Sequence, residues 1–131
     1  MSNHVPASHA DILESTAIGH LATIGADGLP QSTPIWFIFD GEHVKFSVTK
    51  TRQKYGNITQ NPNVAISITD PANPYRYIEV RGQVNRIDDD PEFAFINSCA
   101  QKYLGSDYPW TQPGDERVVG YITPTRSSSM G

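Results

Sequence analysis

The stretch 44–58, VKFSVTKTRQKYGNI, joins the pattern of a strand to the pattern of a short helix. Apolar and polar residues alternate through its first part, which predicts a half-buried strand over residues 42–49. Thr51 is expected to cap a helix over residues 52–60. The helix should end before Pro62, because the residue preceding a proline is pushed out of the helical conformation. The stretch therefore predicts a strand that leads directly into a short helix.

Positive charge gathers where this strand passes into the helix. Lys50, Arg52 and Lys54 lie within five residues of a chain whose formal net charge is −4. A helix N-terminus carries partial positive charge, so it disfavours cations and favours an anion. A bound phosphate or carboxylate would accept hydrogen bonds from the free backbone N–H groups and from the basic side chains. The alternative is a solvated charged turn, but three hydroxyl side chains in the same stretch favour an anion site: Ser47, Thr49 and Thr51.

The remaining patterns predict an antiparallel β protein with few helices. Alternation and turn residues predict a helix over 8–17 and strands over 18–24, 30–39, 63–69, 75–87 and 117–123. A second helix is expected to open at Asp90-Pro91, with Asp90 as its cap. Pro34 removes one ladder hydrogen bond, so its strand should lie at an edge of the sheet or be bulged there. Many strands joined as hairpins favour an antiparallel barrel over a parallel sheet with crossover helices.

Length and composition exclude several classes of protein. The 131 residues are expected to form a single domain, 1–131, and no apolar run is long enough to span a membrane. A pI near 5.4 argues against nucleic-acid binding, which needs a broad basic face. The first residues lack the pattern of a secretory signal, and the single cysteine, Cys99, fits a reducing compartment. We therefore expect a cytoplasmic protein that binds neither nucleic acid nor membrane.

Common catalytic motifs are missing from the sequence. The four histidines have no metal-binding spacing, so no metal site is predicted. No nucleophile elbow or Cys–His signature is present, and Cys99 falls in an apolar helical segment where it serves packing. Glycine-rich nucleotide loops of the Rossmann or P-loop type are also absent. The cationic turn and the aromatic residues are left as the chemistry of the chain.

The order of several motifs resembles one protein family. These motifs are LATIGADGLPQSTPIWF (21–37), TRQKYGNI (51–58), NPNVAISI (61–68) and PYRYIEVRGQV (74–84). Together they resemble the pyridoxamine 5′-phosphate oxidase-like split β-barrel proteins and, among these, the deazaflavin-dependent branch that uses coenzyme F420. The resemblance runs from Leu21 to Ile122. It implies a mainly β fold with short helices, a split antiparallel β-barrel of the FMN-binding type.

The resemblance also implies which residues bind the cofactor. Arg52 and Lys54 correspond to the family's phosphate-binding Arg-x-Lys, with Asn57 one turn further on, and both cations are expected near the surface. Lys50 is expected to attract the anionic tail of F420, and Arg117 to enter the pocket from a second subunit. The backbone of Thr33, Pro34, Ile35 and Trp36 is implied to lie along the ring system of the cofactor. Ser47, Val48 and Thr49 are implied to approach the cofactor's side chain. Tyr75 and Tyr77 are implied to lie near the active pocket.

The function that the resemblance implies is F420-dependent oxidoreduction, with hydride passing from reduced deazaflavin to a small conjugated or aromatic acceptor. Two alternatives stay open: an FMN-binding oxidoreductase on the same barrel, and a non-catalytic flavin- or deazaflavin-binding protein. No catalytic side chain is named, because the cofactor carries the chemistry and the protein supplies binding and orientation. The C-terminal TPTRSSSMG lacks the arginine- and tryptophan-rich segment of true pyridoxamine-phosphate oxidases, so oxidation of vitamin B6 is not expected.

An edge strand with nearby aromatic side chains predicts a homodimer. Pro34 marks the edge, and Trp36 and Tyr77 are expected to be exposed. A second copy of the chain would bury this surface. Each pocket is then expected to be built from both chains.

Overall fold

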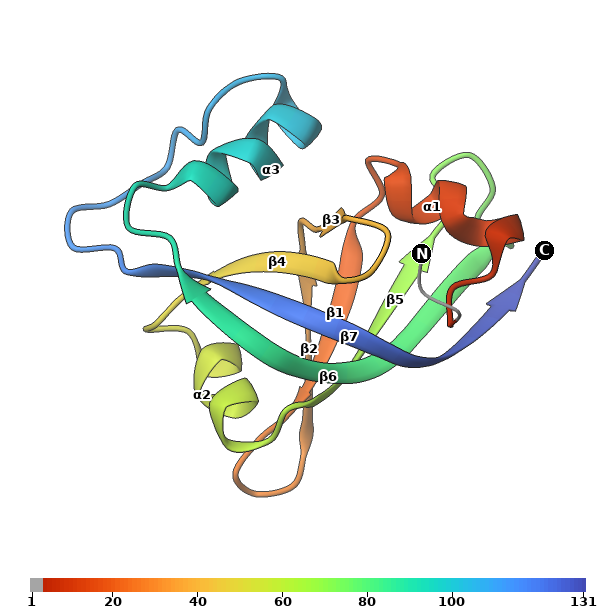
Figure 1. The fold of residues 1–131 in the computed structure, drawn as a ribbon, viewed down its shortest axis with the longest axis horizontal. Helices are drawn as coiled ribbons and strands as arrows, with labels where there is room; N and C mark the ends of the chain where they lie inside the picture. The colour runs from red at the N-terminus through yellow and green to blue at the C-terminus, as the bar shows by residue number, and fades with distance from the viewer. Residues whose placement is uncertain (1–3) are drawn as a thin grey trace.

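Seven antiparallel strands form one sheet that coils on itself in the computed structural model, which describes residues 4–131 (Figure 1). Neighbouring strands follow the order β2-β1-β5-β6-β7-β4-β3. Their bounds are Gly19–Ile24 for β1, Pro30–Ile35 for β2, Ile38–Phe39 for β3, Val44–Thr49 for β4, Asn63–Thr69 for β5, Tyr77–Asp89 for β6 and Arg117–Met130 for β7. The predicted antiparallel β class is confirmed, and so is the edge position of Pro34, since β2 lies at one edge of the sheet.

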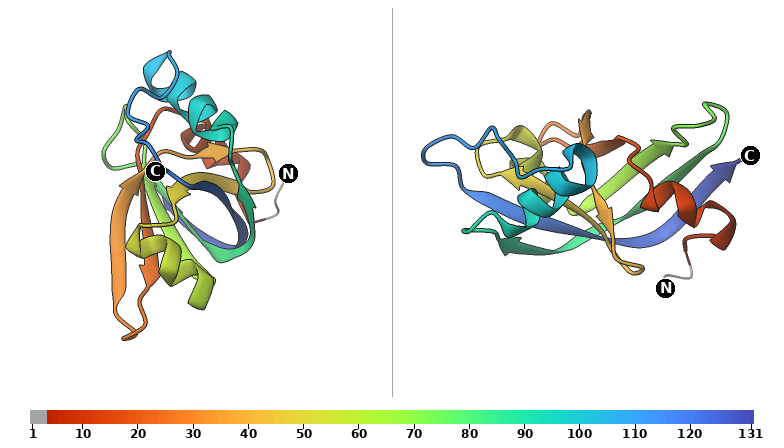
Figure 2. Two further views of the ribbon diagram at one scale, coloured as in Figure 1. Left: turned by 90° about the vertical axis from the view of Figure 1, so that its left-hand side faces the viewer. Right: turned by 90° about the horizontal axis from the view of Figure 1, so that it is seen from above.

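The two longest strands, β6 and β7, run side by side across the molecule (Figures 1 and 2). Two register shifts interrupt their pairing, and such bulges bend a ladder and increase its twist. β7 is longer than the predicted strand over 117–123. The reason is that Pro124 lies at one of the shifts, opposite Gly82, where a missing ladder hydrogen bond is tolerated.

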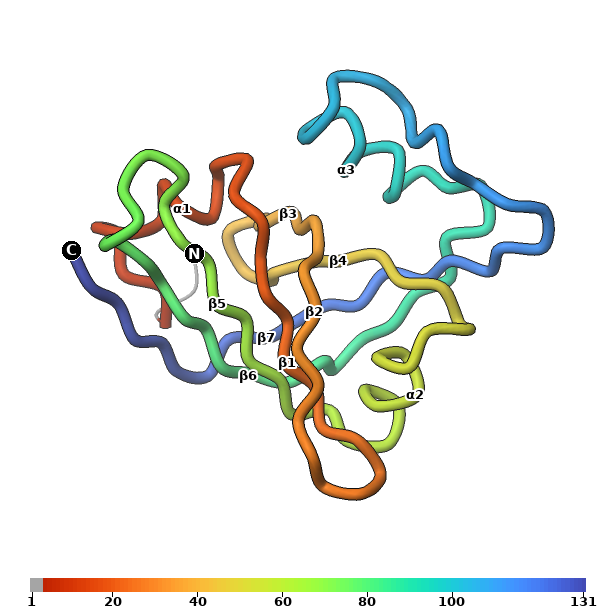
Figure 3. Tube along the Cα trace, turned by 180° about the vertical axis from the view of Figure 1, so that it is seen from behind, coloured from red at the N-terminus to blue at the C-terminus, as the bar shows by residue number. Residues whose placement is uncertain are grey.

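Short helices lie at both ends of the coiled sheet (Figures 1 and 3). They are η1, Ala7–His9; α1, Ala10–Glu14; α2, Gln53–Gln60; and α3, Ala94–Leu104. α2 and α3 flank the point where β4 ends and β7 begins, whereas η1 and α1 lie at the opposite end. Within residues 4–131, no helix is long and apolar enough to cross a membrane.

The first two helices differ in their boundaries from the predicted ones. The first stops before Ser15 instead of reaching residue 17, because the Ser15 hydroxyl donates to the carbonyl oxygen of Ile12 at 2.7 Å and the backbone becomes extended. α2 is confirmed as a helix, but Thr51 does not cap it. Arg52 occupies the N-cap position, and its side chain makes no capping hydrogen bond.

α3 begins at Ala94 rather than at Pro91. Phe93 adopts the left-handed conformation, with φ of 61°, and so separates the Asp90-Pro91 turn from the helix. Asp90 nevertheless caps the helix, since its carboxylate accepts two backbone N–H groups of the first turn at 3.1 and 3.2 Å. The predicted capping residue is therefore confirmed, and the predicted first residue of the helix is wrong.

The hydrophobic core lies inside the coiled sheet. Every second residue of β4 is buried, as the alternation of its sequence predicts. Large side chains that are fully buried include Phe37, Phe46, Ile12, Leu13, Leu21, Ile66, Ile68, Ile78 and Ile122. Because burial of apolar surface is the main driving force of folding, this core holds the sheet in its curled shape.

The predicted strand over 30–39 is divided in two, because Trp36 and Phe37 leave the ladder between β2 and β3. α3 satisfies the backbone of Phe37 instead. The Nζ of Lys102 donates to its carbonyl oxygen at 2.8 Å, and its N–H donates to the Tyr103 hydroxyl oxygen at 3.4 Å. The break places Trp36 against α3 rather than in the sheet.

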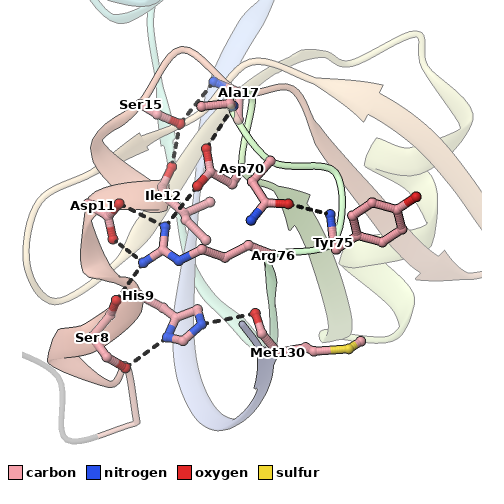
Figure 4. Close-up of polar contacts among 12 residues, drawn as sticks. Ser8, His9, Asp11, Ile12, Ser15, Ala17, Asp70, Tyr75, Arg76 and Met130 are labelled. Carbon is pink, nitrogen blue, oxygen red and sulfur yellow. Dashed lines mark hydrogen bonds and ion pairs between the residues drawn. The ribbon is translucent and has the colours of Figure 1, made fainter.

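Arg76 fastens the N-terminal helices to the turn between β5 and β6 (Figure 4). Its guanidinium donates to the two oxygens of Asp11 at 2.8 and 2.9 Å and to Asp70 at 3.0 Å. Hydrogen bonding to Arg76 holds the pKa of Asp11 below its usual value. Close by, the Nε2 of His9 lies 3.1 Å from the carbonyl oxygen of Met130, which ties the end of β7 to η1.

Gly82 and Gly56 provide a matched pair for testing the β6–β7 ladder. A Cβ on Gly82 would overlap the backbone of Thr123, whereas a Cβ on Gly56 meets nothing within 4 Å. Gly82→Ala should lower the free energy of unfolding by roughly 1–3 kcal/mol, as overpacking does. Gly56→Ala should raise it by roughly 0.5–1 kcal/mol, because glycine is a poor helix former. Urea denaturation measures both, and a Gly82→Ala variant as stable as the wild type would contradict the close approach of the two strands.

Candidate functional site

α2 and α3 flank β4 and β7 at one end of the sheet (Figure 1). A pocket of about 390 Å³ lies between these elements. Side chains from β2, β4, β7, both helices and the loop after α3 line it. Seven of the residues predicted from the sequence are among them: Pro34, Ile35, Trp36, Ser47, Arg52, Lys54 and Arg117. The fold therefore brings together predicted residues that are distant in the chain.

Lys54 is a buried cation at the start of α2. It is 7% exposed, and its Nζ donates to the Thr33 hydroxyl oxygen at 3.1 Å. Burial, followed by the charge of Arg52, lowers the pKa of Lys54. The expectation of a position near the surface is wrong for Lys54, although it holds for the exposed Arg52. A buried ammonium group whose partner is neutral is unfavourable until an anion completes the site.

The start of α2 adds further hydrogen-bond donors. No acidic residue lies in its first turn. The N–H groups of Gln53 and Lys54 donate to no backbone carbonyl in the described part of the chain. A helix of eight residues thus presents free N–H groups and its positive end beside two cations. This is the arrangement that binds phosphate or carboxylate groups.

Aromatic side chains form the wall on the α3 side of the pocket. Trp36 stacks on Tyr103, with ring centres 5.3 Å apart and planes 7° apart. Tyr108 meets Trp36 edge-on at 6.1 Å, and Trp110 meets Tyr108 at 5.5 Å. The Tyr103 hydroxyl donates to the carbonyl oxygen of Ala17 at 2.7 Å, which fixes the ring that supports Trp36. Trp36 therefore provides a rigid, flat, apolar surface.

Sequence reasoning missed the residues that complete this wall. Tyr108 and Trp110 belong to the loop after α3, while Ile18, Ile96 and Cys99 come from other elements. The Tyr-Pro-Trp run in an otherwise polar loop was an available signal, because connecting loops often carry binding residues. The three apolar residues carry no such signal, since only the fold brings them to the pocket. Burial raises the pKa of Cys99 to about 12, so its thiol stays protonated.

Arg117, at the start of β7, lines the pocket of its own chain. Its Nη1 donates to the Ser47 hydroxyl oxygen at 3.1 Å, and its guanidinium carbon lies 4.7 Å from the ring centre of Tyr108. Its Nε is buried and has no hydrogen-bond partner within residues 4–131. The structure thus places Arg117 in the pocket of its own chain, and its entry into the pocket of a second subunit stays a prediction.

Lys50 and Asn57 are absent from the pocket lining that the structure describes. The Nζ of Lys50 is 3.5 Å from Asp89 and 3.7 Å from Glu116, and the charge of Asp89 raises its pKa. Two exposed carboxylates thus partly offset its charge, and its role towards an anionic tail stays a prediction. The buried Asn57 donates to the Thr23 hydroxyl at 3.0 Å and so holds α2 against β1.

The other predicted residues take different positions. Val48 is buried in the core, and the Thr49 hydroxyl lies 3.1 Å from that of Thr51. Tyr75 is 80% exposed in the turn between β5 and β6 (Figure 4), and Tyr77 begins β6. Both tyrosines lie at the α1 end of the sheet, so the structure does not bring them to the pocket of the same chain. Tyr77 is also half-buried rather than exposed.

Comparison with known proteins identifies the family. The family model described as pyridoxamine 5′-phosphate oxidase matches residues 5–130. This chain belongs to the pyridoxamine 5′-phosphate oxidase family. The predicted family and its split-barrel fold are thereby confirmed.

Several solved structures of this fold are similar to the chain. A protein named F420 reductase is 46% identical, covers 95% of this chain and 98% of its own, and has a TM-score of 0.86, in agreement with the deazaflavin branch. A conserved hypothetical protein from Mycobacterium tuberculosis is 28% identical, with 99% and 84% covered and a TM-score of 0.77. General Stress Protein 26 from Bacillus anthracis, 23% identical with 92% and 89% covered and a TM-score of 0.69, supports the fold alone. No curated protein matches the chain.

Lys54→Met is expected to make this family member more stable in the absence of ligand. Methionine keeps much of the apolar stem of lysine but removes a buried charge whose partner is neutral. We expect the free energy of unfolding at pH 7 to rise by roughly 0.5–2 kcal/mol, the usual range for a single stabilising substitution. Arg126→Met, which changes an exposed residue of β7 outside the described pocket lining, is the control and should stay within about 0.5 kcal/mol of wild type.

The stability gain of Lys54→Met should depend on pH. Burial lowers the pKa of Lys54 in the folded state, so between that pKa and the unfolded value of 10.5 the unfolded chain binds more protons. The cost of the buried charge is therefore complete below the folded pKa and fades as the pH rises towards 10.5. Guanidinium denaturation at neutral and alkaline pH measures the change. A variant less stable than wild type at pH 7 would show that the amine is favourably placed without an anion.

Proposed function

We propose that this protein is an F420-dependent oxidoreductase that transfers hydride from reduced deazaflavin to a small conjugated or aromatic acceptor. The observation that carries the proposal is the buried amine of Lys54, which lines the pocket at the start of α2 and has a neutral partner. The 46% identity to the protein named F420 reductase supports F420 as the cofactor.

The α2 end of the pocket fits a phosphate group. Arg52 and Lys54 line it, and neither forms an ion pair with a carboxylate in the part of the chain described. The free N–H groups at the start of α2 add neutral donors. A phosphate would accept hydrogen bonds from all of these, and each bond to a charged group contributes about 1.5–3 kcal/mol. F420 and FMN both carry such a phosphate on a ribityl chain.

The segment from Pro34 to Trp36 fits a flat ring system. Pro34 has no N–H and lies in the edge strand, so its stretch of backbone is free of a second neighbouring strand. Ile35 and Trp36 give this side of the pocket an apolar surface. Because Tyr103 stacks behind Trp36, the indole is held in one orientation. Flat, apolar and rigid walls of this kind suit a conjugated ring.

The residues of this chain bind, orient and exclude water, while bound F420 in its reduced state supplies the hydride. The described lining contains no Asp, Glu or His, and the Cys99 thiol stays protonated because burial raises its pKa to about 12. The pocket thus offers no carboxylate or imidazole for general acid–base catalysis at neutral pH. Ile18, Ile96 and Trp110 add apolar surface that limits the access of water.

An FMN-dependent oxidoreductase is the second candidate. The family model that matches residues 5–130 is that of pyridoxamine 5′-phosphate oxidase, and the α2 end would hold the phosphate of FMN equally well. The pairing of Lys50 with Asp89 and Glu116 also reduces the positive charge available for the anionic tail by which F420 differs from FMN. This observation favours FMN over the expectation from sequence.

Fluorescence titration with both cofactors tests the proposal. The wild type should bind F420 more tightly than FMN. Arg52→Ala and Lys54→Ala should each weaken F420 binding by about 1.5–3 kcal/mol, because each removes a charge-assisted hydrogen bond to phosphate. Arg126→Ala is the matched control and should bind like wild type, since Arg126 is exposed on β7 and outside the described pocket lining.

Turnover then separates an enzyme from a binding protein. With reduced F420, the wild type should reduce a quinone or enone acceptor. Tight F420 binding without turnover of any conjugated acceptor would indicate the non-catalytic binding protein. Tighter binding of FMN, with turnover by FMN alone, would establish the second candidate. Unchanged cofactor affinity in the variant that combines Arg52→Ala and Lys54→Ala would reject the phosphate site itself.

We also propose that the protein is a homodimer. β2 is an edge strand, so the backbone groups on its outer side have no neighbouring strand to pair with in the described sheet. Two large apolar side chains are also exposed: Leu29 in the turn between β1 and β2, and Trp110 beside the pocket. Sedimentation velocity at micromolar concentration should give twice the mass of one chain. A monomer would contradict the dimer, but it would leave Arg117 in the pocket, because its own chain places it there.

A further inference from the structure

The lysines and arginines divide into two groups by their partners. Five form an ion pair with a carboxylate: Lys45, Lys50, Arg76, Arg81 and Arg86. Five form none within residues 4–131: Arg52, Lys54, Lys102, Arg117 and Arg126. Three of the unpaired cations, Arg52, Lys54 and Arg117, line the pocket between α2 and α3, and no carboxylate does so in the described lining. None of the three is paired with a carboxylate in the described lining, while Arg117 also borders a second cavity that Asp89, Asp115 and Glu116 line.

Arg117 stands apart from the other two cations of the pocket. Arg52 and Lys54 belong to the start of α2, whereas Arg117 contacts β4 and the loop after α3. Its partners are neutral: the Ser47 hydroxyl at 3.1 Å from Nη1, and the Tyr108 ring at 4.7 Å from the guanidinium carbon. Its Nη2 makes no hydrogen bond to any described residue. A guanidinium that stacks on a ring keeps its edge free for the two oxygens of a carboxylate.

The position of Arg117 is unfavourable for the stability of the ligand-free protein. Its Nε is buried without a hydrogen-bond partner among the described residues, and unsatisfied buried donors are rare in folded proteins. The contact with Tyr108 offsets only part of the loss, since a π face is a weaker partner than a carboxylate. Buried donors without a hydrogen-bond partner, which ordinary packing avoids, are characteristic of binding sites.

One aromatic ring contacts this cation directly, and two more contact that ring. Tyr108, which stacks on the guanidinium, also contacts Trp36 and Trp110. Trp110 is 56% exposed although it lines the pocket. Indole and phenol rings that stay exposed beside a pocket offer stacking surface to a planar ligand. An anionic group attached to such a ligand would lie within reach of Arg117.

We propose that Arg117 and the rings of Trp36, Tyr108 and Trp110 form an acceptor subsite that selects planar conjugated compounds carrying a carboxylate. The inference rests on the proposed function, because it names the substrate class of that reaction. Arg117 then serves the acceptor rather than the cofactor phosphate, for which the start of α2 already provides two cations and free N–H groups.

A pair of probes tests the subsite directly. 2-Naphthoate carries a carboxylate on a planar aromatic body, and 2-naphthamide is its neutral counterpart of nearly the same shape. Isothermal titration calorimetry measures both, on protein loaded with oxidised F420 and on protein without it. The wild type should bind 2-naphthoate about tenfold or more tighter than the amide, the effect of a hydrogen bond to a charged group.

Variants of Arg117 then locate the origin of this preference. Arg117→Gln should abolish it, and Arg117→Lys should keep part of it, because lysine retains the charge but loses the planar fork. Arg126→Gln, an exposed arginine on the same strand, is the matched control and should keep the full preference. Near-UV circular dichroism verifies the fold of each variant, and Arg117→Lys decides the question if Arg117→Gln does not fold.

The opposite results would overturn the proposal. One is equal binding of the acid and the amide by the wild type. Another is an Arg117→Gln variant that keeps the preference and loses F420 affinity as severely as Lys54→Ala, which would assign Arg117 to the cofactor phosphate. Failure of the proposed function looks different: a protein that binds no F420 but still prefers 2-naphthoate through Arg117 would reject the cofactor and leave the subsite standing.

Discussion

The antiparallel ladder between β6 and β7, bent at two register shifts, positions the rest of the sheet. β5, β1 and β2 follow on one side of it and β4 and β3 on the other, so the curvature of this pair sets the curl of the whole sheet. Two glycines allow close packing here: Gly82 packs against the backbone of Thr123 at one of the shifts, and Gly120 leaves room for the ring of Phe46 on β4. Because the sheet curls, the end of β4 and the start of β7 reach the space between α2 and α3 (Figure 1). The pocket thus depends on contacts that lie far from it.

The polar groups at this pocket lack the partners that such groups have elsewhere in the described structure. On the far side of the sheet, Arg76 meets carboxylates on two sides, and its charge contributes to holding the chain together. In the pocket, Lys54 is buried against a neutral hydroxyl, and the Nε of Arg117 has no partner within the described residues. Trp36 has left the ladder of its strand. Natural proteins concentrate such departures where a ligand restores what the fold lacks, so the pattern itself points to this end of the molecule as the working one.

Local patterns in the sequence were sufficient for most elements of the fold, but not for their ends. The alternation of β4 and the run that forms α2 follow from residues a few positions apart. The extension of β7 past Pro124 depends instead on a register shift opposite Gly82, which lies some forty residues away in the chain. In α3, the left-handed conformation of Phe93 moves the first helical residue beyond the predicted turn. Such boundaries are decided by tertiary contacts, which no local pattern contains.

Some positions of the site residues could likewise be predicted from the sequence and others could not, and Lys50 and Lys54 show why. Four positions apart, they looked alike in the sequence, yet the turn between them directs Lys50 to Asp89 and Glu116 and Lys54 to Thr33. An acidic chain has carboxylates available for pairing across its surface, so a cation close to one is ordinary. A cation that forms no ion pair with any described carboxylate is the exception, since an unpaired charge at a partly buried site is unfavourable. In a protein of net charge −4, the absence of a counter-ion around Lys54 and Arg117 therefore indicates an anion site more strongly than the presence of the cations themselves.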